Sequence, residues 1–326
     1  MDAWKRIKAL WHPEMYHGWG RQNSYFEGWY IKVVNASRDG AYAIIPGISM
    51  DDRGSQHAFI QVLDGIAAKA WYYSFPESDF HPDPNRFALC IGPNRFESDG
   101  IFLDLPLLSG ELRFTNRFPW PGTLLSPGVM GWYSFVPRME CYHGVLSMDH
   151  RIAGTLYRRD RKEEVSFDGG LGYMEKDWGR SFPSWWIWLQ SNHFSGGGRN
   201  SLMVSVARIP FMGSHFNGFL GAWLFEGTLY RFTTYHGARL TSRLEGENLY
   251  ITMTQGPRRL EISGSREAGS GELRSPIRGE MTGKVNESLQ GILEVSFYVG
   301  DRLVYRDTGH MAGLEVAGEV PEHLMC

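Results

Sequence analysis

The segment WWIWLQSNHF, residues 185–194, has the alternation of an extended strand. Because successive side chains of a strand point to opposite faces, one face would combine Trp186, Trp188, Gln190 and Asn192. Buried amides cost free energy unless they are hydrogen-bonded, so such a face is unusual for a plain hydrophobic core. It suits the wall of a ligand cavity, which is mostly apolar with a few polar groups that orient the ligand. We therefore predict a strand whose four side chains contact an apolar small molecule.

Short strand signals of the same kind recur along the whole chain. Aromatic residues make up 14% of the sequence, and glycine supplies 39 of the 326 residues, which fits many strands joined by tight turns. Residues 30–34 and 41–45 are two such strands, and Pro46-Gly47 is expected to end the second. No long window has the 3.6-residue periodicity of a helix. The sequence therefore predicts an all-β protein made of antiparallel sandwiches or barrels.

The length of the chain corresponds to about two domains. The charge run RRDRKEE at residues 158–164 is expected to be the solvated tip of a hairpin near the boundary between them. We therefore expect an N-terminal domain of residues 1–165 and a C-terminal domain of residues 166–326. Residues 115–140 are rich in proline, glycine and aromatic residues and should form a long ordered loop, such as a lid. Residues 195–200, with three consecutive glycines, should form a hairpin turn.

Charge and motif content argue against several classes of partner and cofactor. The net charge is −3 and no basic block occurs, so a nucleic-acid partner is not expected. Cys90, Cys141 and Cys326 form no disulfide framework, which favours a reducing, cytoplasmic compartment. The sequence has neither a paired-histidine metal motif nor a nucleotide-binding glycine loop nor a nucleophile elbow. We expect neither a metal nor a cofactor.

The first eleven residues carry a separate signal. Trp4, Ile7 and Trp11 recur at helical spacing with basic residues between them. Such a helix can lie in a membrane interface, although many similar segments only cap a domain. A peripheral membrane contact through residues 1–11 is therefore a candidate property.

Two motifs place carboxylates beside tryptophans: YFEGW at residues 25–29 and EKDWG at residues 175–179. Residues 25–33, YFEGWYIKV, resemble the opening motif of the tocopherol cyclase family. EKDWG, together with Phe182-Pro183 and the WIWLQ of residues 186–190, resembles the central motif of that family. Residues 310–318, HMAGLEVAG, are similar to its C-terminal end. The resemblance implies two lipocalin-like β-barrel domains, in a group that also includes carotenoid hydratases and lipocalin-like pericyclases.

The resemblance also implies a reaction that requires no cofactor. A general acid would protonate the double bond of a prenylated quinol, the phenol oxygen would attack the resulting tertiary cation, and a base would take the phenol proton. The acid must be a carboxyl group that apolar burial keeps protonated. Asp177 and Glu175 are the first candidates because they lie in the central motif, and Glu27 is the third.

The same resemblance suggests how the substrate would be held. The cation could be stabilised by cation–π contacts with an aromatic ring, and the two amides Gln190 and Asn192 could orient the phenol. The candidate rings are Trp29, Trp178, Trp186 and Trp188.

Other interpretations of these residues stay open. The chain could bind a lipid or isoprenoid without chemistry, or it could be a hydratase in which water captures the same cation. The charges of residues 175–177, beside Arg180, could form a structural ion-pair cluster at a barrel end. Glu27 and Trp29 could likewise serve packing alone.

Overall fold

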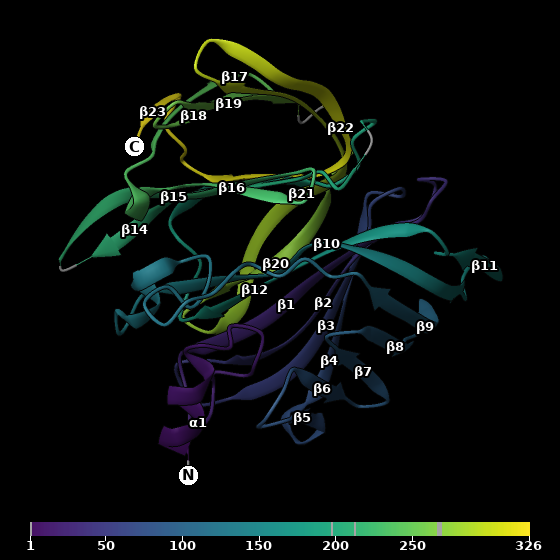
Figure 1. Cartoon of the computed structure of the whole chain (residues 1–326). Coiled ribbons are helices and arrows are strands. Elements are labelled where there is room, and N and C mark those ends of the chain that lie inside the picture. Colours follow the sequence, from purple (N-terminus) through teal and green to yellow (C-terminus); the bar gives the residue numbers. More distant parts are fainter. Residues whose placement is uncertain (1, 197, 212, 266–268) are drawn as a thin grey trace. The chain divides into compact units, whose positions relative to one another are not determined.

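The computed structural model describes residues 2–196, 198–211, 213–265 and 269–326 (Figure 1). Nearly all regular structure in these residues is β, and the helical elements are short. They are α1 (Asp2–Ala9) and three 3₁₀ turns, η1 (Glu77–Asp79), η2 (Gly131–Phe135) and η3 (Thr234–His236). The strands form two large antiparallel sheets of the lipocalin-like kind, which confirms the predicted fold class.

The first sheet has 12 strands in the order β4-β3-β2-β1-β12-β10-β9-β8-β7-β6-β5, with β11 paired to β10. Neighbouring strands are mostly consecutive in the chain, but β12 returns to pair with β1. The strands are β1 (Tyr25–Val34), β2 (Ala41–Met50), β3 (Gln56–Asp64), β4 (Lys69–Pro76), β5 (Phe80–Pro82), β6 (Ala88–Ile91), β7 (Asn94–Glu97), β8 (Gly100–Asp104), β9 (Leu108–Thr115), β10 (Cys141–Arg158), β11 (Glu163–Ser166) and β12 (Gly170–Gly179).

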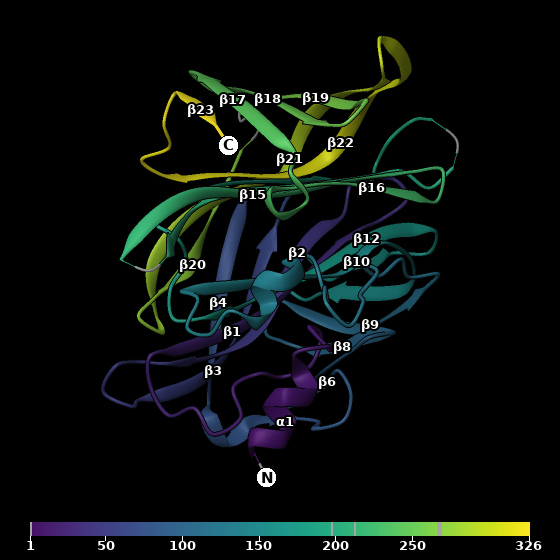
Figure 2. The same cartoon turned by 60° about the vertical axis from the view of Figure 1, so that its left-hand side comes forward.

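The second sheet has 11 strands in the order β16-β15-β14-β13-β22-β21-β19-β18-β17-β23, with β20 paired to β21 (Figure 2). Its neighbouring strands are again mostly consecutive in the chain, and the late strand β22 pairs with the early strand β13. The strands are β13 (Trp185–Ser191), β14 (Ser201–Phe211), β15 (Ser214–Phe225), β16 (Thr228–Thr233), β17 (Arg239–Glu245), β18 (Asn248–Gln255), β19 (Arg258–Ser265), β20 (Gly271–Ile277), β21 (Glu280–Val299), β22 (Arg302–Gly318) and β23 (His323–Met325).

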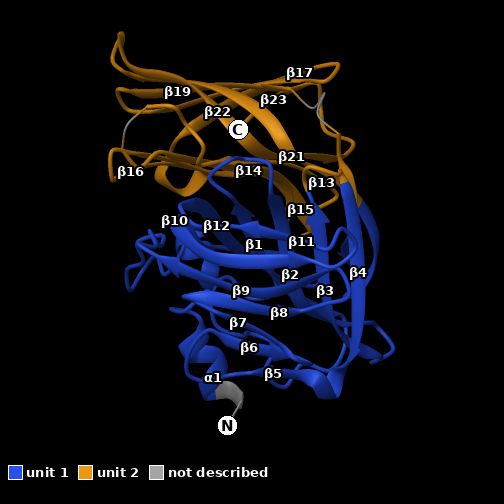
Figure 3. Cartoon of the chain, turned by 90° about the vertical axis from the view of Figure 1, so that its right-hand side faces the viewer, with its two compact units in different colours: residues 1–64, 69–182, 273–284 blue, residues 65–68, 183–272, 285–326 orange. Residues whose placement is uncertain are grey.

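The chain forms two compact units, which Figure 3 colours separately. Unit 1 comprises residues 1–64, 69–182 and 273–284, and unit 2 comprises residues 65–68, 183–272 and 285–326. Each unit has its own hydrophobic core, as expected for strands with alternating apolar residues. These units are defined by contacts between residues, and the folding-domain boundary near residue 165 stays a prediction.

Strand β2 differs from the expectation that Pro46-Gly47 ends it. It continues to Met50, and its pairing with β3 passes through Pro46 without interruption. The pairing of β2 with β1, in contrast, skips Pro46, which has no N–H to donate. Gly47 permits the continuation because the ring of Phe59 lies so close that a Cβ atom would come within 2.4 Å of it. The dipeptide therefore interrupts one ladder and leaves the strand intact.

The predicted hairpin tip and long loop are both present. Arg158 pairs with Glu163 at the turn between β10 and β11, and residues 159–164 are exposed as expected. The side chain of Arg158, in contrast to the expectation of a solvated charge run, is buried and forms an ion pair with Asp64. Residues 116–140 form an ordered loop with a short bridge between Thr123 and Ser126 and the turn η2. The glycine-rich turn of residues 195–200 includes Gly197, which lies outside the described residues. Among the helices of the described ranges, none has the length and hydrophobicity needed to cross a membrane.

Candidate functional site in unit 1

The antiparallel pairing of β1 and β12 brings the two charged motifs side by side. Glu27 lies opposite Trp178, and Trp29 lies opposite Lys176. Because side chains alternate along each strand, these four residues lie on the same face of the sheet. This face packs against the apolar core of unit 1, and we call it the core face. Asp177, which is adjacent in sequence to both Lys176 and Trp178, points to the opposite face, which we call the polar face. The predicted site residues of unit 1 are therefore divided between two faces of one sheet.

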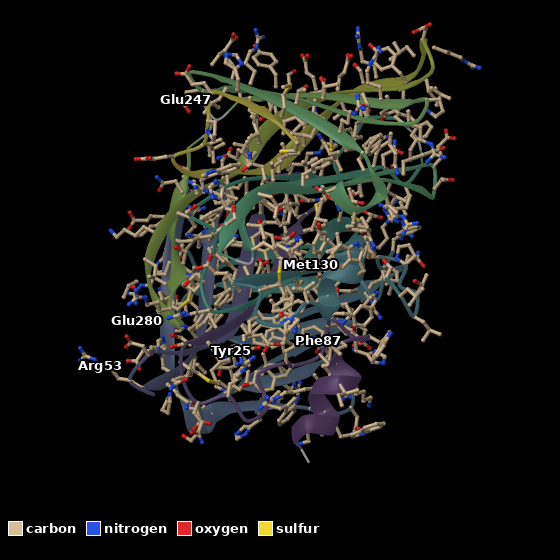
Figure 4. All side chains as sticks on the ribbon, turned by 90° about the vertical axis from the view of Figure 1, so that its left-hand side faces the viewer. Tyr25, Arg53, Phe87, Met130, Glu247 and Glu280 are labelled. Carbon is tan, nitrogen blue, oxygen red and sulfur yellow. The ribbon has the colours of Figure 1, made fainter. Side chains whose placement is uncertain are left out.

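On the core face, Glu27 belongs to a fully buried ion pair. Its carboxylate lies 2.5 Å from Nζ of Lys176, and both side chains are inaccessible to solvent. The carboxylate also accepts hydrogen bonds from the backbone N–H groups of His17 and Gly18, at 2.9 to 3.0 Å, and from the hydroxyl of Tyr25. Tyr25 is labelled in Figure 4. Every lone pair of the carboxylate thus has a donor within reach.

Lys176 ties the N-terminal segment to the same face. Its ammonium group donates to the backbone oxygens of Pro13 and Met15 and, at 2.7 Å, to Nδ1 of His17. The ammonium also lies 4.7 Å from the ring of Trp29 and 4.6 Å from the ring of Trp178. These two tryptophans therefore already contact a cation, which is the ammonium of the protein itself.

The electrostatics of this pair favour the ionised carboxylate. Burial alone would raise the pKa of Glu27, but the charge of Lys176 and the hydrogen bonds from His17 outweigh burial and lower that pKa. Burial lowers the pKa of Lys176 to about 8 against the attraction of Glu27, so the amine is still protonated at neutral pH. The surroundings of Glu27 resemble those of a structural anion more than those of a neutral acid. They support the structural alternative for Glu27 and Trp29.

The polar face carries a second cluster, which consists of His143 from β10 with Glu175 and Asp177 from β12. We call it the His143 cluster. Nδ1 of His143 lies 2.9 Å from Oδ1 of Asp177, and Nε2 lies 3.6 Å from Oε2 of Glu175. The hydroxyl of Tyr173 donates to the same oxygen of Glu175 at 2.6 Å. One imidazole thus bridges the two carboxylates that the central motif supplies.

Burial and charge act in opposite directions on the imidazole. Burial alone would lower the pKa of His143, but the carboxylates of Asp177 and Glu175 outweigh it and raise the pKa to about 9. The imidazole therefore carries its proton at neutral pH. Burial, assisted by the charge of Glu175, raises the pKa of Tyr173 well above its ordinary value, so this phenol remains a hydrogen-bond donor.

The three members of the cluster differ in access. The side chain of Asp177 is 25% exposed, compared with 12% for His143 and 7% for Glu175. The long loop also contacts the cluster, because Sδ of Met130 accepts a hydrogen bond from the backbone N–H of His143 at 3.1 Å (Figure 4). Asp177 is thus the carboxylate most open to an incoming molecule, next to a loop of the kind that can cover it.

Two kinds of chemistry are compatible with this cluster. One ligand atom from each of its three residues lies within 4.8 Å of the others, so the residues could hold a cation. Alternatively, the cluster could store and move protons, since the imidazole of His143 lies between two carboxylates that can exchange a proton with it. The absence of a metal-binding motif in the sequence favours the second kind of chemistry.

The predicted ligand-binding residues of β13 lie in unit 2. Trp185, Ile187 and Leu189 point into the core of that unit, as the alternation predicts. Trp186 and Trp188 therefore lie on the opposite face of β13, together with the amides of residues 190 and 192. Nε1 of Trp186 donates to the carboxylate of Glu315 at 2.6 Å. The ring of Trp188 lies close over Gly313, where a Cβ atom would come within 2.5 Å of it.

His143 was absent from the residues that the sequence predicted. His143 lies two residues after Cys141 in the sequence, but nothing in that spacing identifies the partner of the imidazole. The partner is set by the register of β10 with β12, which places His143 opposite Asp177 and Val145 opposite Glu175. Long-range register of this kind is not encoded in a local pattern.

Solved structures with the same fold are remote in sequence. CghA, crystallised with Sch210972, superposes with a TM-score of 0.57 at 13% identity, over 90% of this chain and 88% of CghA. A structure provisionally assigned as AttH from Nitrosomonas europaea gives a TM-score of 0.53 at 14% identity, over 90% of this chain and 93% of its own. These similarities place the chain in the lipocalin-like fold.

Residues 117–318 match the profile of the tocopherol cyclase-like family, and the chain belongs to that family. A probable chloroplastic tocopherol cyclase of Oryza sativa subsp. japonica is 24% identical over 173 residues. The matched part is 48% of this chain and 35% of the rice protein, so the chain spans only about a third of that relative. The match to the family profile includes the His143 cluster, because β10 and β12 both fall within residues 117–318.

Proposed function

We propose that the protein is a cofactor-independent intramolecular cyclase, or isomerase, that acts on a prenylated aromatic quinol or a related isoprenoid. The observation that carries this proposal is the His143 cluster, where the imidazole lies between the buried carboxylate of Glu175 and the partly exposed carboxylate of Asp177. Membership of the tocopherol cyclase-like family supports the same class of reaction.

In the proposed first step, a proton of the His143 imidazolium passes to the carboxylate of Asp177 and from there to the prenyl double bond. Asp177 suits this relay because it is the most accessible of the three groups. The transfer is direct, since Nδ1 of His143 lies 2.9 Å from Oδ1 of Asp177. The step leaves a tertiary carbocation, an Asp177 carboxylate and a neutral imidazole.

In the second step, the phenol oxygen attacks the carbocation and a ring closes. The phenol proton then returns to the cluster, where Asp177 accepts it and passes it back to His143. Substrate and product are isomers, and the protein undergoes no net change. Glu175, held by the hydroxyl of Tyr173, lies beside the imidazole, and its negative charge favours the return of the proton to His143.

The ligand in this proposal is apolar, and Trp186, Trp188, Gln190 and Asn192 are its proposed binding residues. For Trp29 and Trp178, the contacts with Lys176 support a structural role instead. A cytoplasmic location fits the three free cysteines. Contact of residues 1–11 with a membrane would bring the protein to the lipid bilayer, where apolar ligands of this kind dissolve.

The test is turnover of a prenylated hydroquinone by Asp177→Asn and Glu175→Gln variants. Both should lose roughly 10²–10⁴-fold in rate, the usual contribution of a general acid or base, while quenching of tryptophan fluorescence shows that the ligand still binds. Asp52→Asn, at an exposed turn, is the matched control and should keep the full rate. A full rate in both variants would exclude the His143 cluster as the proton donor.

Product analysis separates the alternatives. A hydratase would give a product heavier by one water, and a binding protein would return its ligand unchanged. Treatment with a chelator should leave turnover unaffected, because no step in the proposal uses a metal. Loss of turnover on chelation, with recovery on adding a divalent cation, would instead assign the three residues to a metal site.

A further inference from the structure

Helix α1 exposes its apolar side to solvent, which is the reverse of what an amphipathic helix on a protein surface normally does. The side chain of Trp4 is 71% exposed, and Ile7 is 51% exposed. The basic residues lie toward the protein instead, with Nζ of Lys5 3.9 Å from the ring of Trp19 and Nζ of Lys8 3.3 Å from the backbone oxygen of Asn85. The apolar side therefore lacks cover within unit 1.

A second apolar projection comes from the long loop of residues 116–140. Thr123 and Ser126 pair with each other through their backbones, so that Leu124 and Leu125 occupy the tip of a tight turn. Their side chains are 79% and 80% exposed. Turn tips ordinarily carry glycine, asparagine, aspartate or proline, and two leucines there expose apolar area with no gain to the fold.

The two projections are joined into one surface. Nε1 of Trp11, just after α1, donates to the backbone oxygen of Leu124 at 3.0 Å, and its ring lies 5.6 Å from that of Phe135 in η2. Figures 1 and 2 agree in placing α1 and the short turn η2 on the same side of unit 1. We call this surface the docking patch; its exposed residues are Trp4, Ile7, Trp11, Leu124, Leu125, Trp132 and Phe135.

The docking patch is distinct from the scattered apolar residues that any protein surface carries. It holds seven of the sixteen large apolar side chains that are exposed among the described residues, and all three of the exposed tryptophans. Contiguous exposed apolar area of this kind marks a contact with a protein or a membrane. Tryptophan is the residue most suited to the membrane interface, because one end of its ring is apolar and the other donates a hydrogen bond.

Charge decides between these two partners. The segments that build the docking patch, residues 2–12 and 116–140, contain five basic side chains and two acidic side chains. The whole chain, in contrast, has a net charge of −3. A local excess of positive charge around apolar and aromatic side chains complements the surface of an anionic bilayer, which attracts basic groups near it.

We propose that the docking patch binds the surface of an anionic lipid bilayer, with Leu124, Leu125 and the tryptophans inserted among the headgroups and the basic residues above them. The proposal rests on the membrane contact suggested for residues 1–11 and adds the turn of residues 123–126 as its second anchor. It also places the loop that contacts His143 at the lipid surface, where an isoprenoid substrate would be found.

The experiment is co-sedimentation of the full chain with phosphatidylcholine vesicles that either contain or lack phosphatidylglycerol. The protein should sediment with the anionic vesicles, and added salt should weaken its binding. The variant Leu124→Asp/Leu125→Asp should reduce the partition coefficient at least about tenfold, since it removes the inserted apolar groups and adds like charge. Met325→Asp, at a side chain that is 81% exposed in β23, is the matched control and should bind as the unmodified protein does.

Three results would overturn the proposal. One is an unmodified protein that stays in the supernatant with both kinds of vesicle, and another is a double variant that binds as well as its parent. The third comes from sedimentation velocity without vesicles, if the unmodified protein is a dimer and the double variant is a monomer. The docking patch would then be a self-association surface. Turnover with substrate in detergent micelles should survive the double variant, since Leu124 and Leu125 take no part in the proposed reaction. An unmodified protein that binds anionic vesicles but turns over no substrate would contradict the proposed reaction and leave docking intact.

Discussion

Nδ1 of His143 lies 2.9 Å from Oδ1 of Asp177, across the antiparallel pairing of β10 with β12. The pairing connects a strand that shows no motif with the charged motif EKDWG of residues 175–179. It turns two carboxylates into a cluster that holds a proton at neutral pH, since the pKa of His143 is raised to about 9. The consequences for pH dependence and for stability can be measured.

The raised pKa of His143 predicts a pH-dependent stability. The unfolded chain releases the imidazole proton near the ordinary pKa of 6.5, whereas the folded chain keeps it to about 9. The folded state thus binds more protons between these values, and its extra stability is complete below pH 6.5 and is lost as the pH rises to 9. The shift corresponds to a loss on the order of 3 kcal/mol. Urea denaturation across this range measures it.

The control for this prediction is His143→Gln, which cannot titrate. The difference in free energy of unfolding between the parent and this variant should shrink as the pH rises from 6.5 to 9, because other groups contribute equally to both proteins. A difference that stays constant over the range would mean that His143 is not charged in the folded protein.

The ion pair of Glu27 and Lys176 predicts a large cost for single substitutions. Glu27→Gln or Lys176→Met alone leaves the partner buried and uncompensated, which should lower the free energy of unfolding by about 3–5 kcal/mol. The double variant should cost much less than the sum of the two, because neither charge remains. Chemical denaturation of the four proteins gives the coupling. If the loss of stability in the double variant equals the sum of the two single losses, the two charges do not interact. The control is Arg113→Ala, which breaks an exposed ion pair with Glu111 and should have little effect on stability.

Two glycines that face each other across β1 and β2 predict opposite outcomes. A Cβ atom on Gly47 would come within 2.4 Å of the ring of Phe59 and 2.5 Å of the backbone oxygen of Glu27, so Gly47→Ala should cost roughly 1–3 kcal/mol. A Cβ atom on Gly28 would meet only ordinary contacts at 3.6 Å or more, so Gly28→Ala should be tolerated. Thermal unfolding of both variants tests the difference, and equal stability would contradict the strand continuity at Pro46-Gly47.

Much of the fold could be predicted from local patterns. The alternation of residues 185–194 correctly separated two faces of a strand, with Ile187 in the core of unit 2 and Trp186 on the other face. The charge run at residues 158–164 correctly indicated a hairpin tip. These features succeed because side-chain alternation and turn chemistry act over a few neighbouring residues.

The site was less predictable because it depends on strand order. The return of β12 to β1 decides that Lys176 neutralises Glu27, and the register of β10 decides that His143 meets Asp177. Neither pairing follows from spacing in the sequence. Glu27 and Lys176 lie far apart in the chain, and His143 lies on a strand that shares no motif with the strand of Asp177. The carboxylates were visible in the sequence, but the groups that set their charge were not.

The most direct test of the account is turnover of a prenylated hydroquinone in deuterium oxide, followed by mass spectrometry of the product. Protonation by the His143 cluster predicts a ring-closed isomer that carries one deuterium on the carbon next to the new C–O bond, and none when Asp177→Asn is used. A product without that deuterium, a product heavier by one water, or an unchanged ligand would contradict it.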